Sequence, residues 1–284
     1  MATSDTRHTL AQGERLKGSA YTYEIIRTLG QGAFGITYLA RIQVKAELGS
    51  ISTHVAVKEF YMSEVNGRQG ATVTYSSDGG LFGKYREKFV NEAVRLSRLS
   101  HPNIVKVLET FEANNTVYYS MEYIEGGTLD SRIQESGGLE EREALELTLG
   151  ISEALAELHS HNMLHLDLKP GNIMLRDGKT PVLIDFGLSK QYDKEGNPES
   201  STSIGGGTPG YSPIEQMHYT GDNTGDLPVT MDIYALGATM FKMLTARRPP
   251  EAPVILNEGF PDEALAGVSQ PVLRLITAAM RPLR

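Results

Sequence analysis

The chain has 284 residues, of which 40% are hydrophobic and 22% charged, and its formal net charge is −8. This length suffices for one large domain or for two lobes that each bury a core. The acidic balance excludes a general basic surface for nucleic acid, and the absence of cysteine excludes disulfides and thiolate zinc sites. The sequence starts without an apolar signal core, and no apolar run reaches the ~18–20 residues that span a bilayer. We therefore expect a cytoplasmic chain with no membrane segment and no nucleic-acid partner.

The elements predicted at the start of the chain are mostly strands. Residues 1–20 are polar and unpatterned, so we expect a flexible tail. Short β-type runs with glycines extend over Tyr23–Leu39, and a Val- and Ala-rich strand covers His54–Lys58. Residues 61–83 are polar and contain five glycines, which predicts a long loop. In Lys84–Ser100, apolar residues at spacings of three and four predict a helix.

The chain becomes mostly helical after a last strand in this part, predicted over Thr116–Ile124, and the pair Gly126-Gly127. The elements expected beyond it are a helix over residues 140–161, short strands at Asn172–Leu175 and Pro181–Ile184, a long loop over 193–210 and a buried helix over Asp232–Leu244. The pattern indicates an α+β fold with a small β-rich lobe that carries one helix and a larger helical lobe.

The glycines of Gly30-Gln31-Gly32-Ala33-Phe34-Gly35 are spaced so that backbone N–H groups can approach phosphate oxygens. A flexible β-turn would explain them equally well. A dinucleotide fold requires a helix after the glycines, whereas Ile36–Leu39 favours another strand. The glycines therefore lie in a predicted hairpin, which argues against a nicotinamide site.

Lys58 ends the apolar strand Val55–Lys58. Such a lysine is commonly just a solvated strand end. Its alternative role is to supply a cation to ATP phosphates, and this role needs a carboxylate that holds the flexible amine in place. Glu92, on the apolar-faced helix, is the candidate, although it could equally be an ordinary exposed glutamate.

The most informative stretch is His165-Leu166-Asp167-Leu168-Lys169-Pro170-Gly171-Asn172. Phosphoryl transfer needs a carboxylate to accept the proton of the attacking hydroxyl, oxygen ligands for Mg²⁺ and a cation near the γ-phosphate. Asp167, Asn172 and Lys169 are of these types. Asp185-Phe186-Gly187 follows at the end of an apolar strand, where a carboxylate can bind the metal. Each piece alone could be a turn or capping residue, but their combination in this order indicates phosphoryl transfer.

Together these motifs resemble the protein kinase superfamily from about Tyr21 onward. The combination of Lys169 and Thr208 resembles the pattern of Ser/Thr protein kinases. The stretch Phe34–Ala40 is most similar to the eukaryotic-type (Hanks-type) kinases of bacteria. The resemblance implies the bilobal kinase fold, with an N-lobe over 21–121, a hinge over 122–127 and a C-lobe over 128–284. It also implies transfer of the γ-phosphate of ATP to Ser or Thr hydroxyls of protein substrates, with Mg²⁺ or Mn²⁺ as cofactor.

The resemblance assigns roles to individual residues. Asp167 would be the base with Lys169 beside it, and Lys58, paired with Glu92, would contact the α- and β-phosphates. Asn172 and Asp185 would hold the metal. The other residues expected around ATP are Leu29, Gly30, Gln31, Gly32, Ala33, Phe34, Gly35, Thr37, Ala56, Met121 as gatekeeper, Glu122, Ile124 and Met174. Those expected in the activation segment are Asp185, Phe186, Gly187, Thr202, Ser203, Thr208 and Glu215.

Two other functions compete with an active protein kinase. A pseudokinase would bind ATP or act as a scaffold, but inactive relatives usually lose at least one key residue, and here all are present. A small-molecule kinase of the aminoglycoside or choline type shares the H-x-D-x-x-x-x-N loop. Against it stand Lys169 and the complete end of an activation segment, Gly207–Glu215.

The sequence departs from the family pattern at several points. Leu166 replaces the arginine that usually precedes the catalytic aspartate, Thr37 replaces a valine, and the polar stretch 61–83 is an insertion. The chain also stops at Arg284, short of a helix whose arginine would pair with Glu215, so we expect a piece of a longer chain.

Leu166 has a regulatory consequence. The arginine it replaces often pairs with a phosphate on the activation segment. We predict weak dependence on phosphorylation there, unless another basic residue supplies the charge. The candidates for that substitute are Arg86, Lys88 and Lys190.

Overall fold

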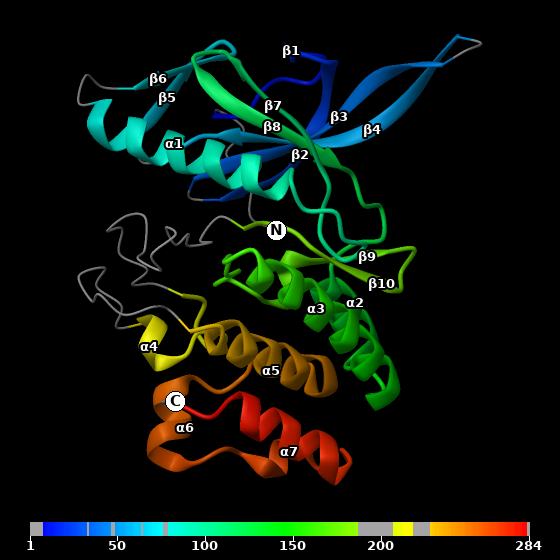
Figure 1. The fold of residues 1–284 in the computed structure, drawn as a ribbon, viewed down its shortest axis with the longest axis vertical. Helices are drawn as coiled ribbons and strands as arrows, with labels where there is room; N and C mark the ends of the chain where they lie inside the picture. The colour runs from blue at the N-terminus through cyan, green and yellow to red at the C-terminus, as the bar shows by residue number, and fades with distance from the viewer. Residues whose placement is uncertain are drawn as a thin grey trace. The chain divides into compact units, whose positions relative to one another are not determined.

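The computed structural model describes residues 8–32, 34–46, 49–63, 65–75, 79–186, 207–217 and 228–282. It divides into two compact units (Figure 1). The N-terminal unit comprises residues up to Ser100 together with Val105–Tyr123, and the C-terminal unit comprises His101–Ile104 and the chain from Ile124 onward. The division after Tyr123 falls inside the stretch that was predicted as a hinge.

A six-stranded antiparallel sheet in the order β1-β2-β3-β4-β8-β7 forms the body of the N-terminal unit. Its strands are β1 (Arg15–Lys17), β2 (Thr22–Gly32), β3 (Gly35–Ala46), β4 (Gly49–Phe60), β7 (Val107–Ala113) and β8 (Thr116–Glu122). Helix α1 (Gly79–Leu96) packs along β7 and β8 (Figure 1). The strands and the helix that the sequence predicted correctly are those whose apolar residues repeat with the period of a strand or of a helix.

One hydrophobic core of this unit lies on the face of the sheet opposite α1. Alternate residues of the strands point into it, as the pleat requires, and they include Tyr23, Tyr38, Val57 and Tyr118. The Tyr23 ring stacks on Phe111 at a centroid distance of 5.0 Å. The inserted segment and the chain before β2 cover this face.

The prediction of a flexible tail over residues 1–20 was wrong for the described residues 8–20. Leu10 and Leu16 are buried in the core, and β1 pairs with β2. The backbone N–H groups of residues 19–21 donate to the Glu109 carboxylate. These contacts span almost ninety residues of sequence, which is why a local pattern did not reveal them.

The loop predicted over residues 61–83 was also wrong in part. It contains an antiparallel hairpin of β5 (Asn66–Gln69) and β6 (Thr72–Tyr75), and α1 already begins at Gly79. Val73 is buried, and its N–H donates to the Asn114 carbonyl in the β7–β8 turn. The hairpin is therefore attached to the sheet by contacts distant in sequence.

The C-terminal unit is mostly helical, as predicted. Its elements are α2 (Leu129–Ser136), α3 (Glu141–Ser160), a 3₁₀ turn at Pro170–Asn172, β9 (Ile173–Arg176), β10 (Thr180–Leu183), α4 (Ile214–Met217), α5 (Thr230–Thr245), α6 (Ala252–Glu258), a 3₁₀ turn at Asp262–Leu265 and α7 (Gln270–Ala279). Helix α5 is buried on nearly all sides and packs against α3 and α7. None of the described helices is long and apolar enough to cross a bilayer.

Gly126 shows why the chain needs glycine just after the first unit ends. A Cβ at this position would overlap the Leu175 carbonyl oxygen of β9. The N–H of Leu175 donates to the carbonyl of Gly127, whose φ of 75° is favourable for glycine. Close backbone approach therefore selects the glycine pair.

Candidate active site

Asp167 lies in the loop between α3 and β9, where three side chains donate to its carboxylate. Lys169 Nζ donates to Oδ2 at 2.7 Å, and Thr208 Oγ1 donates to Oδ1 at 2.7 Å. Asn172 Nδ2 donates to Oδ2 at 2.9 Å and to the Asp167 carbonyl at 2.8 Å. Lys169 Nζ also donates to Thr208 Oγ1 at 2.9 Å. The structure thus brings together the predicted base, the predicted cation and a threonine from the end of the activation segment.

A buried aspartate holds the backbone just before Asp167. Asp232 on α5 is fully buried and accepts the N–H groups of His165 and Leu166, each at 2.9 Å. His159 Nε2 lies 2.8 Å from Asp232 Oδ2. The sequence predicted a buried helix here, but it gave no sign of His159, because a histidine in the last turn of a helix has many ordinary roles.

Leu166 adopts a left-handed conformation with φ of 61° and is buried. Its carbonyl accepts a hydrogen bond from Gln216 Nε2 at 2.7 Å. A branched side chain at positive φ is uncommon and persists only where its surroundings fix it. Asp232 and Gln216 supply this restraint, and sequence analysis did not identify Gln216.

Asp185 and Asn172 lie at adjoining ends of the paired strands β9 and β10. The N–H of Ile184 donates to the Asn172 carbonyl at 3.0 Å. Asp185 has φ of 58°, and buried Phe186 packs on the His165 ring at 4.8 Å. Burial lowers the pKa of the His165 imidazole despite the opposing effect of nearby aspartates. His165 is fully buried and packs on Phe186, so it acts as a packing residue beneath the loop.

The donor set near Asn172 fits a hard cation. Its amide nitrogen is directed at Asp167, so its amide oxygen is the atom left to ligate, and Asp185 adds a carboxylate. Such oxygens suit Mg²⁺ or Mn²⁺. No cluster of three or more His, Asp or Glu side chains that could hold a metal occurs among the described residues, so any remaining ligands would come from phosphate oxygens or water.

In the N-terminal unit the predicted glycine loop is a hairpin. Gly30 pairs with Thr37 and Gly32 with Gly35 across β2 and β3, and Phe34 stacks on Tyr85 at 5.1 Å. Leu29 and Gln31 lie on β2 as expected. Ala33 lies outside the described residues, as do Gly187, Thr202, Ser203 and Lys190 of the activation segment.

Lys58 and Phe89, which lies one turn of α1 before Glu92, both contact Tyr119 of β8. Lys58 Nζ is 5.8 Å from the centre of the Tyr119 ring, and buried Glu92 follows one turn of α1 after Phe89, which packs on the same ring at 5.0 Å. The Lys58–Glu92 ion pair itself remains a prediction.

The predicted adenine contacts occupy the same part of the sheet and the start of the C-terminal unit. Ala56 pairs with Met121 across β4 and β8, and the N–H of Glu122 donates to the Lys106 carbonyl. In the C-terminal unit, Ile124 is buried and Met174 lies on β9, bridged to Thr128. Their contact with adenine stays a prediction.

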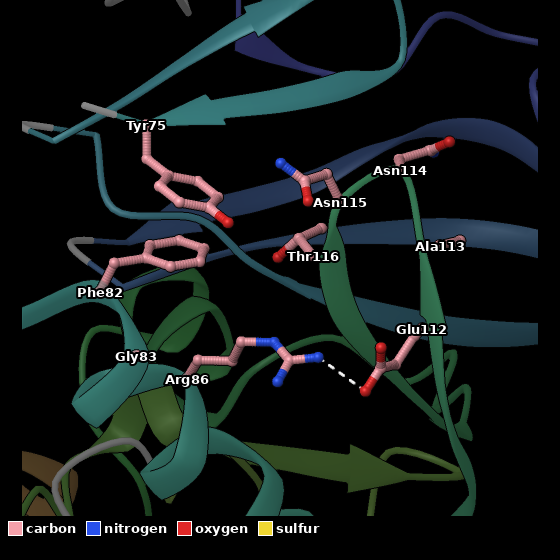
Figure 2. A pocket seen from close by; sticks show the side chains of 9 residues that line it. All are labelled: Tyr75, Phe82, Gly83, Arg86, Glu112, Ala113, Asn114, Asn115 and Thr116. Carbon is pink, nitrogen blue, oxygen red and sulfur yellow. Dashed lines mark ion pairs between the residues drawn. The ribbon is translucent and has the colours of Figure 1, made fainter. Parts of the chain in front are cut away.

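A cavity of about 480 Å³ lies elsewhere in the N-terminal unit, among the inserted hairpin, the start of α1 and the β7–β8 turn (Figure 2). Tyr75 and Phe82 stack on one side of it at 4.3 Å. Arg86 forms an ion pair with Glu112 at 2.6 Å. Arg86, one of the suggested phosphate partners, therefore already has an acidic partner.

Glu215, at the start of α4, has its Oε2 atom buried without a hydrogen-bond partner among the described residues. The nearby Tyr234 has a raised pKa, first because of burial and second because of the Glu215 charge.

Comparison with known proteins places the chain. The family model described as "Protein kinase domain" matches residues 23–258. This chain belongs to the protein kinase family. Serine/threonine-protein kinase PknA of Nostoc sp. is 33% identical over 238 residues, which cover 81% of this chain and 38% of PknA. Serine/threonine-protein kinase PrkC of Bacillus subtilis is 31% identical over 240 residues, covering 84% and 32% respectively.

A solved kinase structure agrees with this fold. "PpkA-294 apo form" matches with a TM-score of 0.75 and 26% sequence identity over 96% of this chain and 93% of that one. The bilobal α+β fold is thus confirmed, as is the resemblance to Hanks-type Ser/Thr kinases. The chain spans about a third of the length of the two curated relatives named above.

Proposed function

We propose that this chain is an active protein kinase domain that transfers the γ-phosphate of ATP to Ser or Thr hydroxyls of protein substrates. The observation that carries the proposal is the convergence of Lys169, Thr208 and Asn172 on the Asp167 carboxylate. Lys169 and Thr208 are the pair typical of Ser/Thr kinases, and they are 39 residues apart in the sequence.

Asp167 is positioned to act as the general base. Its carboxylate would orient the substrate hydroxyl and accept its proton as the oxygen bonds to the γ-phosphorus and the bond to ADP breaks. Lys169, whose ammonium already lies 2.7 Å from Asp167, would stabilise negative charge on the transferred group. The three donors fix the orientation of the carboxylate before substrate arrives.

ATP would be held by residues of both units. Gly30–Gly35 and Lys58 would contact the phosphates, and the backbone around Glu122 and Ile124 would contact adenine. Asn172 and Asp185 would hold Mg²⁺ or Mn²⁺, which would neutralise charge on the phosphates. These assignments follow from the family and from the placement of the residues within each unit.

The direct test is a transfer assay with γ-labelled ATP, Mg²⁺ and a generic basic protein, followed by analysis of the labelled amino acids. We expect label on Ser or Thr, and no label when excess chelator removes the metal. ATP binding without any transfer would contradict the proposal and indicate an ATP-binding scaffold.

A further inference from the structure

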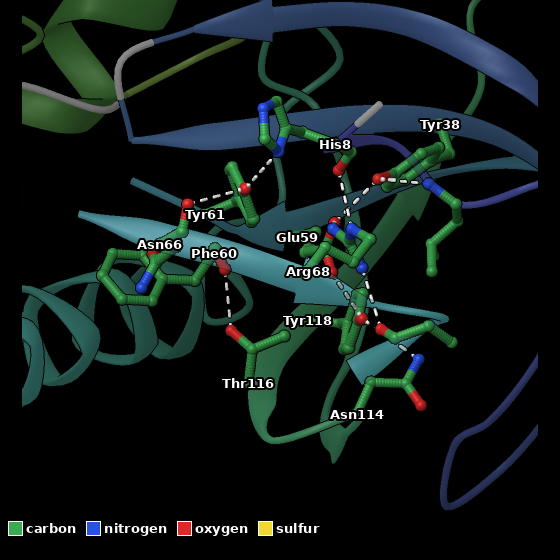
Figure 3. Close-up of polar contacts among 12 residues, drawn as sticks. His8, Tyr38, Glu59, Phe60, Tyr61, Asn66, Arg68, Asn114, Thr116 and Tyr118 are labelled. Carbon is green, nitrogen blue, oxygen red and sulfur yellow. Dashed lines mark hydrogen bonds and ion pairs between the residues drawn. The ribbon is translucent and has the colours of Figure 1, made fainter. Parts of the chain in front are cut away.

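Glu59 is a fully buried carboxylate in the strand that carries Lys58 (Figure 3). Tyr118 donates its hydroxyl to Oε1 at 2.7 Å, and Tyr38 donates to Oε2 at 2.7 Å. Arg68 of the inserted hairpin donates to Oε2 at 2.6 Å. The donors come from β3, β8 and β5, so one carboxylate joins the two neighbours of β4 and the insertion.

Arg68 is the cation of this group, and its side chain is only 2% exposed. Besides Glu59, it donates from Nε to the His8 carbonyl at 2.7 Å and from Nη1 to the Ala71 carbonyl at 2.9 Å. Its guanidinium also lies over the Tyr61 ring at 5.1 Å. All three guanidinium nitrogens are therefore used, and they tie the chain before β1 and the hairpin turn to the sheet.

The charges of this pair compensate each other inside the unit. Burial would lower the pKa of Arg68, but the charge of Glu59 and its hydrogen bond, together with the two tyrosines, raise that pKa overall. Burial, and then the Glu59 charge, raise the pKa of Tyr38 and of Tyr118. Both tyrosine hydroxyls therefore stay protonated and donate hydrogen bonds to Glu59. Among the described residues around Glu59, Arg68 supplies the compensating positive charge.

The pleat connects this group to the catalytic lysine. Successive side chains of a strand point to opposite faces, so Glu59 faces the core and Lys58 faces the other side. The pairing of β4 with β8 shows the same alternation of faces, because Glu59 pairs with Tyr118 and Lys58 pairs with Tyr119. The position of Lys58 therefore depends on how Glu59, its covalent neighbour, is held.

We propose that Arg68 is a positioning residue that, through Glu59, fixes the segment of β4 from which Lys58 reaches the ATP phosphates. The inference rests on the proposed function, in which Lys58 contacts those phosphates. Without Arg68, the Glu59 charge would lie unpaired in the core. Relief would require water entry, protonation or displacement of β4, and each of these changes disturbs the strand beside Lys58.

The test compares two ligands, because adenosine lacks the phosphates that Lys58 contacts. We would measure the Kd of ATP and of adenosine, by calorimetry, for the wild-type chain, Arg68→Met and Arg68→Lys, at a temperature where all are folded. The matched control is Arg41→Met, which removes an arginine from an ion pair with Glu24 on the same sheet, where both side chains are exposed.

For Arg68→Met we expect the Kd of ATP to rise about tenfold, with the Kd of adenosine changed less than twofold. Arg68→Lys keeps the charge but loses the planar fork, so an increase of about threefold for ATP is expected. Arg41→Met should change neither value. An unchanged Kd of ATP in folded Arg68→Met, or equal weakening of both ligands, would overturn the proposal.

Two further outcomes are decisive. If Arg68→Met does not fold, Arg68→Lys becomes the test variant. An unchanged ratio of the Kd of ATP to the Kd of adenosine in Arg68→Lys would then overturn the proposal. Lys58→Met reports on the proposed function separately. If Lys58→Met leaves that ratio unchanged, the phosphate-binding role of Lys58 is wrong, and the inference about Arg68 fails with it.

Discussion

Each unit contains a fully buried carboxylate next to a residue assigned to catalysis. In the C-terminal unit, Asp232 accepts hydrogen bonds from the two backbone N–H groups that precede Asp167. In the N-terminal unit, Glu59 accepts hydrogen bonds from two tyrosine hydroxyls and from Arg68, and it directly follows Lys58. Both carboxylates restrain the backbone beside a functional side chain.

The two carboxylates differ in what stabilises their charge. Asp232 is held by backbone dipoles of a short loop and by His159, whereas Glu59 needs a cation from the inserted hairpin. The family match begins at residue 23, yet the His8 carbonyl before it is bound by Arg68. The backbone before Asp167 is thus held by a helix of its own unit, whereas the strand that carries Lys58 is held through the inserted hairpin and the segment before the family match.

The largest expected effect tests the C-terminal centre itself. Asp167→Asn keeps the shape but removes the proton acceptor, so kcat should fall about a hundred- to ten-thousandfold while ATP still binds. Single-turnover transfer assays would measure this loss. The matched control is Asp177→Asn in the exposed β9–β10 turn, where φ of 54° suits asparagine. Retention of a tenth of wild-type kcat by Asp167→Asn would refute the assignment of the base.

The next effect concerns the stability of the N-terminal unit. Arg68→Met leaves the buried Glu59 carboxylate without its cation, which should lower the free energy of unfolding by about 3–5 kcal/mol. Arg41→Met breaks an exposed ion pair and should cost less than about 1 kcal/mol. Urea titrations followed by circular dichroism would compare the two. If both variants lost the same small amount of unfolding free energy, the buried Glu59–Arg68 pair would stabilise the unit no more than an exposed ion pair does.

These two sites also show what the sequence could and could not reveal. The types and order of Asp167, Lys169 and Asn172 are fixed within six residues, so the local motif predicted their convergence. The family resemblance added Thr208. Nothing local predicted that Arg68 of a polar, glycine-containing stretch would be buried, because its burial depends on Glu59 facing the core and on His8, which precedes the family match.

The same limit applies to the fold. Strands β3, β4 and β8 and helices α3 and α5 were predicted because apolar residues repeat along them. The hairpin β5–β6 has a single buried apolar side chain, Val73, and β1 has three residues. Long-range hydrogen bonds stabilise these short elements, and no periodic pattern of apolar residues marks them in the sequence. Pattern reasoning therefore assigned them to a loop and a tail.

A smaller effect tests the second attachment of the N-terminal segment. A Cβ at Gly18 would collide with the Glu109 carboxylate and would lie 2.9 Å from the Tyr23 ring. Gly18→Ala should therefore destabilise the unit by about 1–3 kcal/mol. Gly83→Ala in α1 is the control, because no atom lies within 4 Å of its Cβ. It should stabilise by about 0.5–1 kcal/mol. Thermal melts that show no difference between them would contradict the role of Gly18.

The smallest expected effect concerns the charge that Leu166 lacks. The Leu166 side chain is buried and apolar, so the usual arginine partner for an activation-segment phosphate is absent at this position. Phosphatase treatment should change kcat less than about threefold, since no charge-assisted pair is lost there. The comparison needs treated and untreated enzyme, assayed before autophosphorylation recovers. A tenfold fall that is reversed by rephosphorylation would show that another basic residue takes that role.

The measurement that tests the comparison most directly is the ATP Kd and the kcat at saturating ATP for Asp232→Asn and Arg68→Met side by side. Asp232→Asn leaves one of two backbone N–H groups without its acceptor beside Asp167, so we predict a fall in kcat of about tenfold with the Kd of ATP unchanged. Arg68→Met should show the reverse, with a Kd raised about tenfold and kcat within about threefold of wild type. If both variants changed Kd and kcat in the same proportion, the two carboxylates would be general stabilisers, and neither would have a specific role beside its catalytic residue.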